Sequence, residues 1–207
     1  MKKFSSFKQF MLRSIVLLML VFTGIALKAQ TTYYVDVTRS DNSGDGKSWA
    51  NAKKDIQVAM NLAVSGDAVW VKGGTYYPTM DPFANASPTD PRDKTIYLTN
   101  GVALYGSFAG TETTLAQRTA SVRAANTTTI SGDIGTVSDN TDNCYHVVLS
   151  VSGTTTTILD GFTITAGNAN GSGSITVASK TIQRTRGAGM CNSFANPTIT
   201  NLSLIHI

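Results

Sequence analysis

The sequence predicts an all-β protein with one short helix near its start. Beyond residue 66, runs of strand length recur in which apolar and polar side chains alternate. The segments between these runs are rich in Gly, Asn, Asp and Ser, as turns are. No second amphipathic helix separates the runs, which excludes the strand–helix alternation of a doubly wound α/β fold. Two architectures remain open on these observations: a sandwich or barrel of hairpins, and a solenoid of stacked coils.

Residues 1–29 have the three parts of a secretory signal peptide. A basic start is followed by an uncharged apolar run, Ile15–Ala26, and by a small residue, Ala29, just before the expected cleavage point. This run is much shorter than the roughly 20 residues that cross a bilayer core. We therefore expect a removable leader rather than an anchor, a secreted or outer-surface location, and no membrane span in the mature chain.

The leader also accounts for the basic balance of the chain, which has 17 Lys and Arg against 13 Asp and Glu. Five of the basic residues and none of the acidic ones lie in it: Lys2, Lys3, Lys8, Arg13 and Lys28. The remaining 12 basic and 13 acidic residues leave the mature chain a net charge of −1. A chain without a basic excess lacks the electrostatic footprint of a nucleic-acid-binding protein, so no nucleic-acid partner is expected.

The first part of the mature chain, residues 30–66, combines a strand, a turn and the helix. Tyr33–Val37 alternates as a strand does, and Asp41–Gly46 is a cluster of turn residues. In Lys53–Ala63, apolar side chains recur at helical spacing, and Gly66 stands where a helix stop belongs. The apolar positions are Ile56, Ala59, Met60 and Ala63. Because one face of this helix is apolar, it is expected to cover other apolar residues.

The rest of the chain reads as short strands. They are expected within residues 67–77, 95–108, 127–134, 145–151, 155–165 and 197–204. Asn100-Gly101 is a candidate two-residue hairpin turn, and threonine runs at 127–129 and 154–157 fit exposed sheet faces. A similar phrase in 101–106 and 161–167, a glycine followed by an alternating strand and a small-residue corner, favours the solenoid.

A resemblance to a known superfamily favours the solenoid further. YYVD (33–36), GKSWANA (46–52), the helix, SGDAVWV (65–71) and GTY (74–76) together resemble the module that opens right-handed parallel β-helix proteins of the pectin-lyase-like superfamily, especially large surface proteins of Bacteroidota. GVALYGSFAGTET (101–113), ILDGFTITAGNANGSG (158–173) and GAGMCNS (187–193) look like the same group. The last phrase is also similar to the glycine-rich repeat of polymorphic outer-membrane proteins.

The resemblance implies a right-handed parallel β-helix in which residues 67–207 form the coils and the helix caps the first one, since solenoids need capped ends. The sequence stops at Ile207 in what reads as the middle of a coil. We therefore expect the 207 residues to be the N-terminal part of a longer protein. Members of the superfamily include polysaccharide lyases, hydrolases and adhesins, so the resemblance does not specify one activity.

Polysaccharide lyases on this fold use a Lys or Arg base, and usually carboxylates that hold Ca²⁺ on one sheet face. The acidic stretch 133–142 offers Asp133, Asp139 and Asp142 as calcium candidates, and Lys72 or Arg118 could serve as the base. A solvated loop between two strands is the favoured reading of this stretch. The turn Asp41–Gly46 imitates the start of an EF-hand loop, but Ala52 stands where that loop needs a bidentate Glu.

Other chemistry-bearing residues favour structural roles. His146 lies in a predicted strand, and the second histidine, His206, is at the very end of the sequence, so neither a metal-ligand pair nor a Ser-His-Asp set can be assembled. Trp49 and Trp70 are candidate sugar-stacking residues, but their apolar neighbours favour packing.

The two cysteines, Cys144 and Cys191, lie in a chain expected to be exported, where a disulfide is permitted. At typical coil lengths they would lie two rungs apart, near 10 Å at about 4.8 Å per rung. A disulfide needs Cα atoms within about 7 Å, so this spacing favours two free thiols.

We expect a secreted or cell-surface β-helix scaffold that is adhesive or glycan-binding and non-catalytic, with no cofactor other than Ca²⁺ in view. The alternative is the N-terminal part of a secreted polysaccharide lyase or glycoside hydrolase. Carboxylates converging on a basic side chain in a groove would favour the enzyme.

Overall fold

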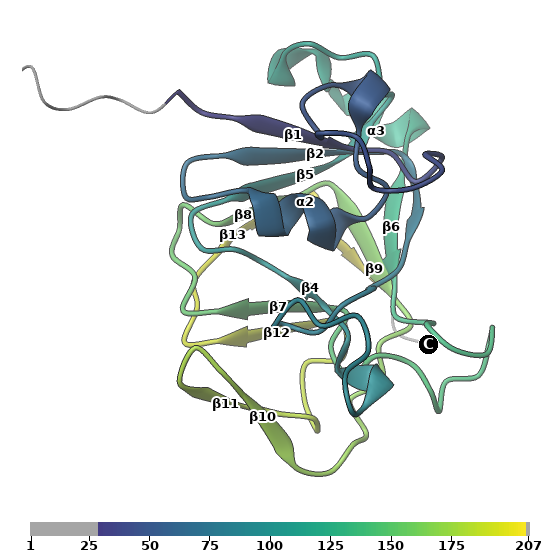
Figure 1. Ribbon diagram of the computed structural model, residues 1–207, viewed down its shortest axis with the longest axis vertical. Helices are drawn as coiled ribbons and strands as arrows, with labels where there is room; N and C mark the ends of the chain where they lie inside the picture. The colour runs from purple at the N-terminus through teal and green to yellow at the C-terminus, as the bar shows by residue number, and fades with distance from the viewer. Residues whose placement is uncertain (1–28, 206–207) are drawn as a thin grey trace, which may run out of the picture. The chain divides into compact units, whose positions relative to one another are not determined.

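The structure is a computed structural model that describes residues 29–205 (Figure 1). His206 and all but the last residue of the predicted leader lie outside this range. Within it the chain is mostly β, with three parallel sheets, one antiparallel hairpin and few helices. The predicted all-β class is thus confirmed. None of the helices in residues 29–205 has the length and apolar character that a bilayer-spanning helix requires.

Most strands belong to three parallel sheets, named here A, B and C. Sheet A has the order β1–β2–β5–β8–β13, formed by Thr32–Val35, Ala68–Lys72, Ala103–Phe108, Ile158–Asp160 and Thr198–Thr200. Sheet B has the order β3–β6–β9–β14, formed by Gly74–Tyr76, Thr128–Ser131, Phe162–Thr165 and Ser203–Leu204. Sheet C has the order β4–β7–β12, formed by Ile96–Tyr97, Val148–Val151 and Met190–Ser193.

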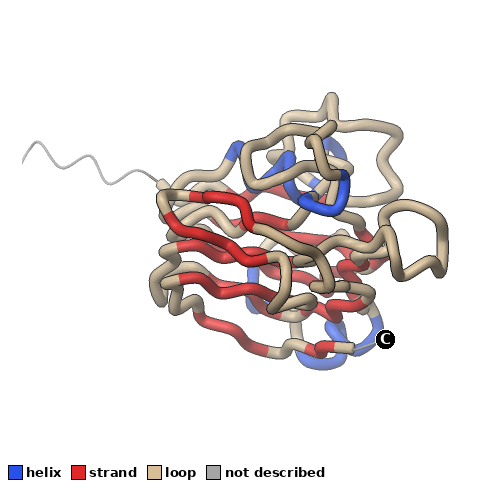
Figure 2. Tube along the Cα trace, turned by 90° about the horizontal axis from the view of Figure 1, so that it is seen from below, coloured by secondary structure: helices blue, strands red, loops and turns tan. Residues whose placement is uncertain are grey.

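The chain visits the sheets in a fixed order. After β2 in sheet A it forms β3 in sheet B and β4 in sheet C, and then returns to sheet A as β5. The same order recurs from β5 to β7, and from β8 through β9 to β12. Figure 2 shows the resulting strands stacked side by side. Because all three sheets are parallel, a sandwich of hairpins is excluded for them.

Inward side chains of the three sheets meet in one core. In sheet A, Val69, Leu104 and Leu159 lie in register on neighbouring strands and are fully buried. Ile164 of sheet B and Val148 of sheet C belong to the same cluster. Side chains alternate between the two faces of a strand, which is why the period-2 pattern of the sequence marked these strands.

The predicted helix is α2, Ile56–Leu62. Ile56, Ala59 and Met60 are buried in the main core, as the spacing predicted, and Ala63 follows them at the end of the helix. The helix contacts β1 and β2 of sheet A and β4 of sheet C. It therefore covers the core at the end where the first strands of these two sheets lie (Figure 1). The second helix, α3 (Ala120–Ala125), was not predicted and contacts β5.

A hairpin that the sequence analysis missed covers the outer face of sheet C. It consists of β10 (Ser174–Val177) and β11 (Lys180–Gln183), which pair antiparallel. Its Val177 and Ile182 pack on Leu149 and Val151 of β7, so both faces of that strand are buried. The two turn residues, Ala178 and Ser179, both have positive φ (46° and 62°). Two-residue hairpin turns with positive φ at both positions usually contain Asn or Gly, and this turn contains neither.

Two local predictions were wrong. Asn100-Gly101 does not join a hairpin, because β4 before it lies in sheet C and β5 after it lies in sheet A. The two copies of the recurring phrase are not equivalent either, since 101–106 leads into β5 of sheet A and 161–167 contains β9 of sheet B. The phrase marks a kind of strand and corner rather than one position of a repeating coil.

The cysteines are free, and the predicted reason needs correction. Strand β12 pairs directly with β7, so Cys191 lies opposite Leu149, one strand away rather than two. Cys144 precedes Leu149 by five residues and lies outside β7, so it has no register partner in β12. Burial raises the pKa of the Cys144 thiol to about 12, which keeps it protonated and unreactive.

Candidate functional site

The outward face of sheet B carries a row of hydroxyl side chains. Thr75, Thr129, Thr163 and Ser203 occupy the same register position on four neighbouring strands. Their alternate neighbours, such as Ile130 and Ile164, point inward and are buried. Neighbouring strands lie about 4.8 Å apart, so the hydroxyl groups repeat at about that interval. All four residues are at least partly exposed, and the row is open to a ligand.

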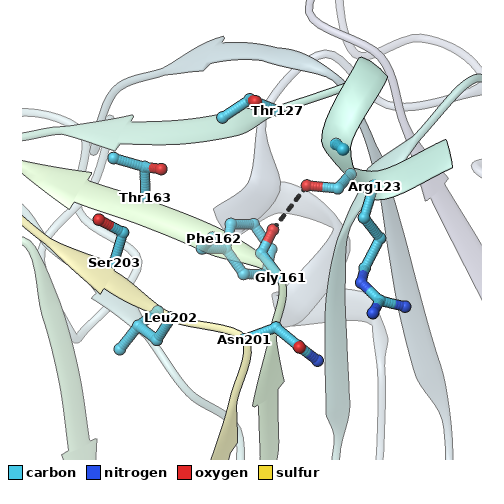
Figure 3. A pocket seen from close by; sticks show the side chains of 10 residues that line it. Arg123, Thr127, Gly161, Phe162, Thr163, Asn201, Leu202 and Ser203 are labelled. Carbon is cyan, nitrogen blue, oxygen red and sulfur yellow. Dashed lines mark hydrogen bonds between the residues drawn. The ribbon is translucent and has the colours of Figure 1, made fainter. Parts of the chain in front are cut away.

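A hollow of about 290 Å³ lies where the strands of sheet B begin (Figure 3). Its lining residues come from sheet B, from α3 and from the turns that lead into β6, β9 and β14: Ser107, Arg123, Ala124, Thr127, Gly161, Phe162, Thr163, Asn201, Leu202 and Ser203. Thr163 and Ser203 also belong to the hydroxyl row, so the row runs into this hollow. Ser107 Oγ donates to the carbonyl of Gly161 at 2.9 Å, which ties β5 to the floor of the hollow (Figure 3).

The lining of this first hollow mixes apolar side chains, such as Phe162 and Leu202, with polar ones and carries no carboxylate. In Figure 3 the guanidinium of Arg123 and the amide of Asn201 lie at one end of the hollow, and Thr163 and Ser203 at the other. Arg123 Nη1 donates to the carbonyl of Arg118 at 3.1 Å, and Asn201 Nδ2 donates to Asp160 Oδ1 at 2.7 Å. These bonds fix both groups while their remaining donors can meet hydroxyl or carboxyl oxygens of a ligand.

A second hollow of about 350 Å³ lies where β3 and β6 end. It is lined by Tyr77, Pro78, Thr79, Lys94, Asp133 and Ile134. The side chain of Tyr77 is 49% exposed there, and Lys94 and Asp133 line the same space. The first hollow adjoins the starts of the sheet B strands and the second adjoins their ends, so the two hollows flank the hydroxyl row.

The two residues that the sequence suggests as a catalytic base, Lys72 and Arg118, each form an ion pair away from the acidic loop. Lys72 Nζ pairs with Asp36 at 2.8 Å, and Arg118 Nη1 pairs with Asp160 Oδ2 at 3.2 Å. Burial acts to raise the pKa of Asp36, but hydrogen bonds from Lys72 and Thr38 outweigh it and leave the pKa below its usual value. Both basic groups hold carboxylates other than the three calcium candidates.

The three calcium candidates lie in the loop between β6 and β7 and hold that loop together. Asp133 accepts from the Ser138 amide at 3.0 Å, and Asp142 accepts from the Thr136 amide at 2.7 Å. Hydrogen bonds from the Thr141 hydroxyl and amide lower the pKa of Asp139.

No group of three acidic, His or Cys side chains suited to a metal occurs in the described part of the chain. Asp133 and Asp142 each retain one buried carboxylate oxygen without a hydrogen-bond partner in the loop. Two oxygens fall short of the six to eight that Ca²⁺ takes. Backbone carbonyls or water would have to supply the other ligands of a calcium ion at this loop.

The remaining candidates have structural partners. His146 is buried, its Nδ1 lies 3.2 Å from the carbonyl of Gly187, and burial lowers its pKa. Trp70 stacks on Phe108 with ring centroids 4.6 Å apart, and Trp49 Nε1 donates to the carbonyl of Glu112 at 2.9 Å. Both indoles therefore pack on the outer face of sheet A.

The imitation of a calcium loop at residues 41–46 is a turn. Asp41 accepts from the Ser43 amide at 2.8 Å, and Asp45 accepts from the Lys47 amide at 2.9 Å. Such bonds from an Asp side chain to the backbone two residues on are typical of Asx turns.

Sequence reasoning missed most residues of this site. The run 127–129 was predicted to lie on an exposed sheet face, and Thr129 does so, whereas 154–157 lies in the loop before β8. Arg123 and Lys94 gave no signal, because the helix and the loop that carry them follow no periodic pattern. The described chain thus has a polar sheet face between two hollows. No protein-family model, curated protein or solved structure matches this chain.

Proposed function

We propose that this protein is a secreted or cell-surface scaffold that binds glycans without altering them chemically. The observation that carries the proposal is the hydroxyl row Thr75–Thr129–Thr163–Ser203, flanked by one hollow at the starts and another at the ends of the sheet B strands. A polysaccharide presents hydroxyl groups at regular intervals along an extended chain. A regular array of side-chain hydroxyls, each one donor and two acceptors, is chemically suited to it.

The rigidity of the array supports the proposal. Each hydroxyl of the row is carried by a strand that pairs with its neighbours, so little side-chain or backbone order has to be created on binding. Arg123 and Asn201 add donors on one side of the row, and Tyr77 offers an exposed ring on the other side. A ring and a few convergent polar groups are what recognition of a sugar requires.

The architecture we propose is a right-handed parallel β-helix of the pectin-lyase-like kind. Its support is the fixed order in which the chain visits three parallel sheets, together with α2 at the end of the core. Residues 1–29 would act as the signal peptide that delivers the protein out of the cell. Outside the cell, polysaccharides and the glycans of neighbouring cells are the available partners, which also suits an adhesive role.

One observation favours the enzyme alternative. Lys94 and Asp133 line the same hollow beside the exposed Tyr77, and a base next to a carboxylate is the minimum equipment of a polysaccharide lyase or hydrolase. Incubation with polygalacturonate and with neutral polysaccharides separates the two functions. Release of unsaturated or reducing ends that disappears in Lys94→Met would establish the enzyme.

Affinity electrophoresis through gels that contain single polysaccharides tests the binding proposal. The variant is the double substitution Thr129→Val and Thr163→Val, because valine keeps the shape and strand preference of threonine and removes the hydroxyl. We expect retardation of the unaltered protein by at least one polysaccharide and an affinity at least tenfold lower for the variant.

The matched control is Thr181→Val, which removes an exposed strand hydroxyl on the hairpin, away from the row. It should migrate as the unaltered protein does. Absence of retardation by every polysaccharide, or equal retardation of the double variant, contradicts the proposal.

A further inference from the structure

The corner between β12 and β13 contains an unusual aromatic residue. Phe194 is 78% exposed and has φ of +50°. A bulky side chain in the left-handed region is a conformational outlier that persists only when its surroundings enforce it. Burial cannot explain this phenylalanine, since most of its side chain contacts solvent.

The corner requires the backbone conformation but not the side chain. Ser193 pairs with Val151, which places Phe194 level with Ser152 on the preceding strand's corner. Ser152 is also left-handed, with φ of +56°. Two bonds between the corners hold this geometry: the Ser152 amide donates to the Ser193 carbonyl at 3.0 Å, and the Asn196 amide to the Gly153 carbonyl at 2.7 Å. Serine, asparagine or glycine would serve such a corner with less strain.

Phe194 lines a hollow of about 510 Å³ at this corner. The other lining residues are small or polar, and none is charged: Gly153, Thr154, Thr155, Ala195 and Asn196. Lys180 Nζ lies 4.3 Å from the centre of the Phe194 ring, so an ammonium group covers one face of the ring. That contact orients the ring and leaves its other face for a ligand.

The composition of the hollow selects the chemistry of its ligand. Besides the Phe194 ring, the lining has a small apolar side chain, Ala195, and a purely apolar ligand would also meet the polar groups of threonine and asparagine. An ionic ligand would find no charged residue in the lining. A pyranose ring has a face of C–H bonds, which suits the electron-rich face of phenylalanine, and a rim of hydroxyls, which suits threonine and asparagine.

We propose that the Phe194 hollow is a second saccharide subsite, which stacks a neutral pyranose ring on the open face of Phe194. The ligand class rests on the proposed function, but the site shares no residue with the hydroxyl row or the two hollows beside it. It lies between the ends of sheet C strands and the starts of sheet A strands. The protein would thus hold glycan at two separate places, which raises its avidity for polymers and cell surfaces.

Titration calorimetry with cellohexaose, mannohexaose, laminarihexaose and xylohexaose tests the subsite. Phe194→Ala and Phe194→Asn should each lower the affinity for at least one of these neutral oligosaccharides by tenfold or more, and Phe194→Tyr should retain it. Phe194→Asn should melt at or above the temperature of the unaltered protein, because asparagine tolerates the left-handed conformation. A loss of binding in that variant is then not a loss of folding.

Phe83→Ala is the matched control, since Phe83 is 60% exposed and lies in the loop between β3 and β4, outside this hollow. The affinity of Phe83→Ala for these oligosaccharides should equal that of the unaltered protein. If the unaltered protein binds oligosaccharide and both Phe194→Ala and Phe194→Asn bind equally well, the subsite is wrong and the proposed function stands. If the unaltered protein binds no glycan of any kind, the proposed subsite and the proposed function are both wrong. A self-association that Phe194→Ala abolishes would identify a protein contact instead and overturn the subsite.

Discussion

Arg118 and Asp160 form an ion pair that ties the segment after β5 to strand β8. Arg118 Nη1 lies 3.2 Å from Asp160 Oδ2, Nη2 donates to the Asp160 carbonyl at 3.0 Å, and Nε donates to the carbonyl of Gly106. The Arg118 side chain is only 3% exposed. Since Asp160 also accepts from Asn201, this buried pair positions one end of the first hollow.

Replacing Arg118 should therefore lower the free energy of unfolding of the protein substantially. Arg118→Met keeps the apolar stem but leaves Asp160 without its cation, and breaking a buried pair in this way costs about 3 to 5 kcal/mol. Arg118→Lys should recover only part of the loss, because one ammonium cannot reproduce the planar donor set of a guanidinium. Urea unfolding measures the free energy of unfolding of both variants, Arg118→Met and Arg118→Lys. A loss below about 1 kcal/mol for Arg118→Met would show that the pair is structurally unimportant.

The glycine at the floor of the first hollow should not tolerate a side chain. Gly161 has φ of +83°, and a Cβ there would overlap the guanidinium of Arg118. Gly161→Ala should cost more than the roughly 1 to 2 kcal/mol of a left-handed alanine. Gly66→Ala is the control, since Gly66 also has a positive φ (+94°) but open space around its Cβ. Equal thermal destabilisation of the two variants would argue against the predicted overlap.

Stability should fall as the pH falls below about 6.5, and His146 should contribute to the change. Burial lowers the pKa of His146 in the folded protein, so the unfolded chain, with a histidine pKa of about 6.5, binds the proton more readily. The stabilisation is fully present above that pH and is lost as the pH falls through the folded-state value. Melting curves from pH 8 to pH 5 should show a smaller decline for His146→Gln. Parallel curves for both proteins would assign the decline to other groups.

The hairpin over sheet C should depend on one ion pair. Arg184 Nη2 lies 2.5 Å from Asp93 Oδ2, and its guanidinium also lies over the ring of Tyr145, 5.3 Å from the ring centre. Arg184→Ala should speed amide hydrogen exchange in β10 and β11 and expose Lys180 to trypsin. Arg186→Ala, an exposed arginine without an ion pair among the described residues, should leave both rates unchanged. Unaltered exchange in Arg184→Ala would mean that Val177 and Ile182 suffice to hold the hairpin.

The parts of the fold that follow from local patterns could be predicted. Ile56, Ala59 and Met60 recur at helical spacing and are buried on one helix face. Val69 alternates with Trp70 and is fully buried in sheet A. By contrast, the turn Ala178-Ser179 lacks the residues that normally mark a hairpin, and α3 is a short helix with no buried residue to reveal it.

The candidate site was largely hidden in the sequence for a different reason. Thr75, Thr129, Thr163 and Ser203 are brought together only by strand register, and the loops between them differ in length. Acidic spacing drew attention to the loop 133–142, whose carboxylates bind their own backbone instead. A hydroxyl row across neighbouring strands is a property of the assembled sheet, and no single segment contains it.

Amide chemical shifts recorded with and without glycan would show directly whether the outward face of sheet B binds it. The probe is the oligosaccharide of whichever polysaccharide retards the protein most strongly, added to isotope-labelled protein. We expect the largest shift changes at Thr75, Thr129, Thr163 and Ser203 and around the hollows on either side of this row, and we expect them to vanish in the double valine variant. Shift changes that avoid sheet B, or that persist unchanged in that variant, would contradict the claim that this face binds glycan.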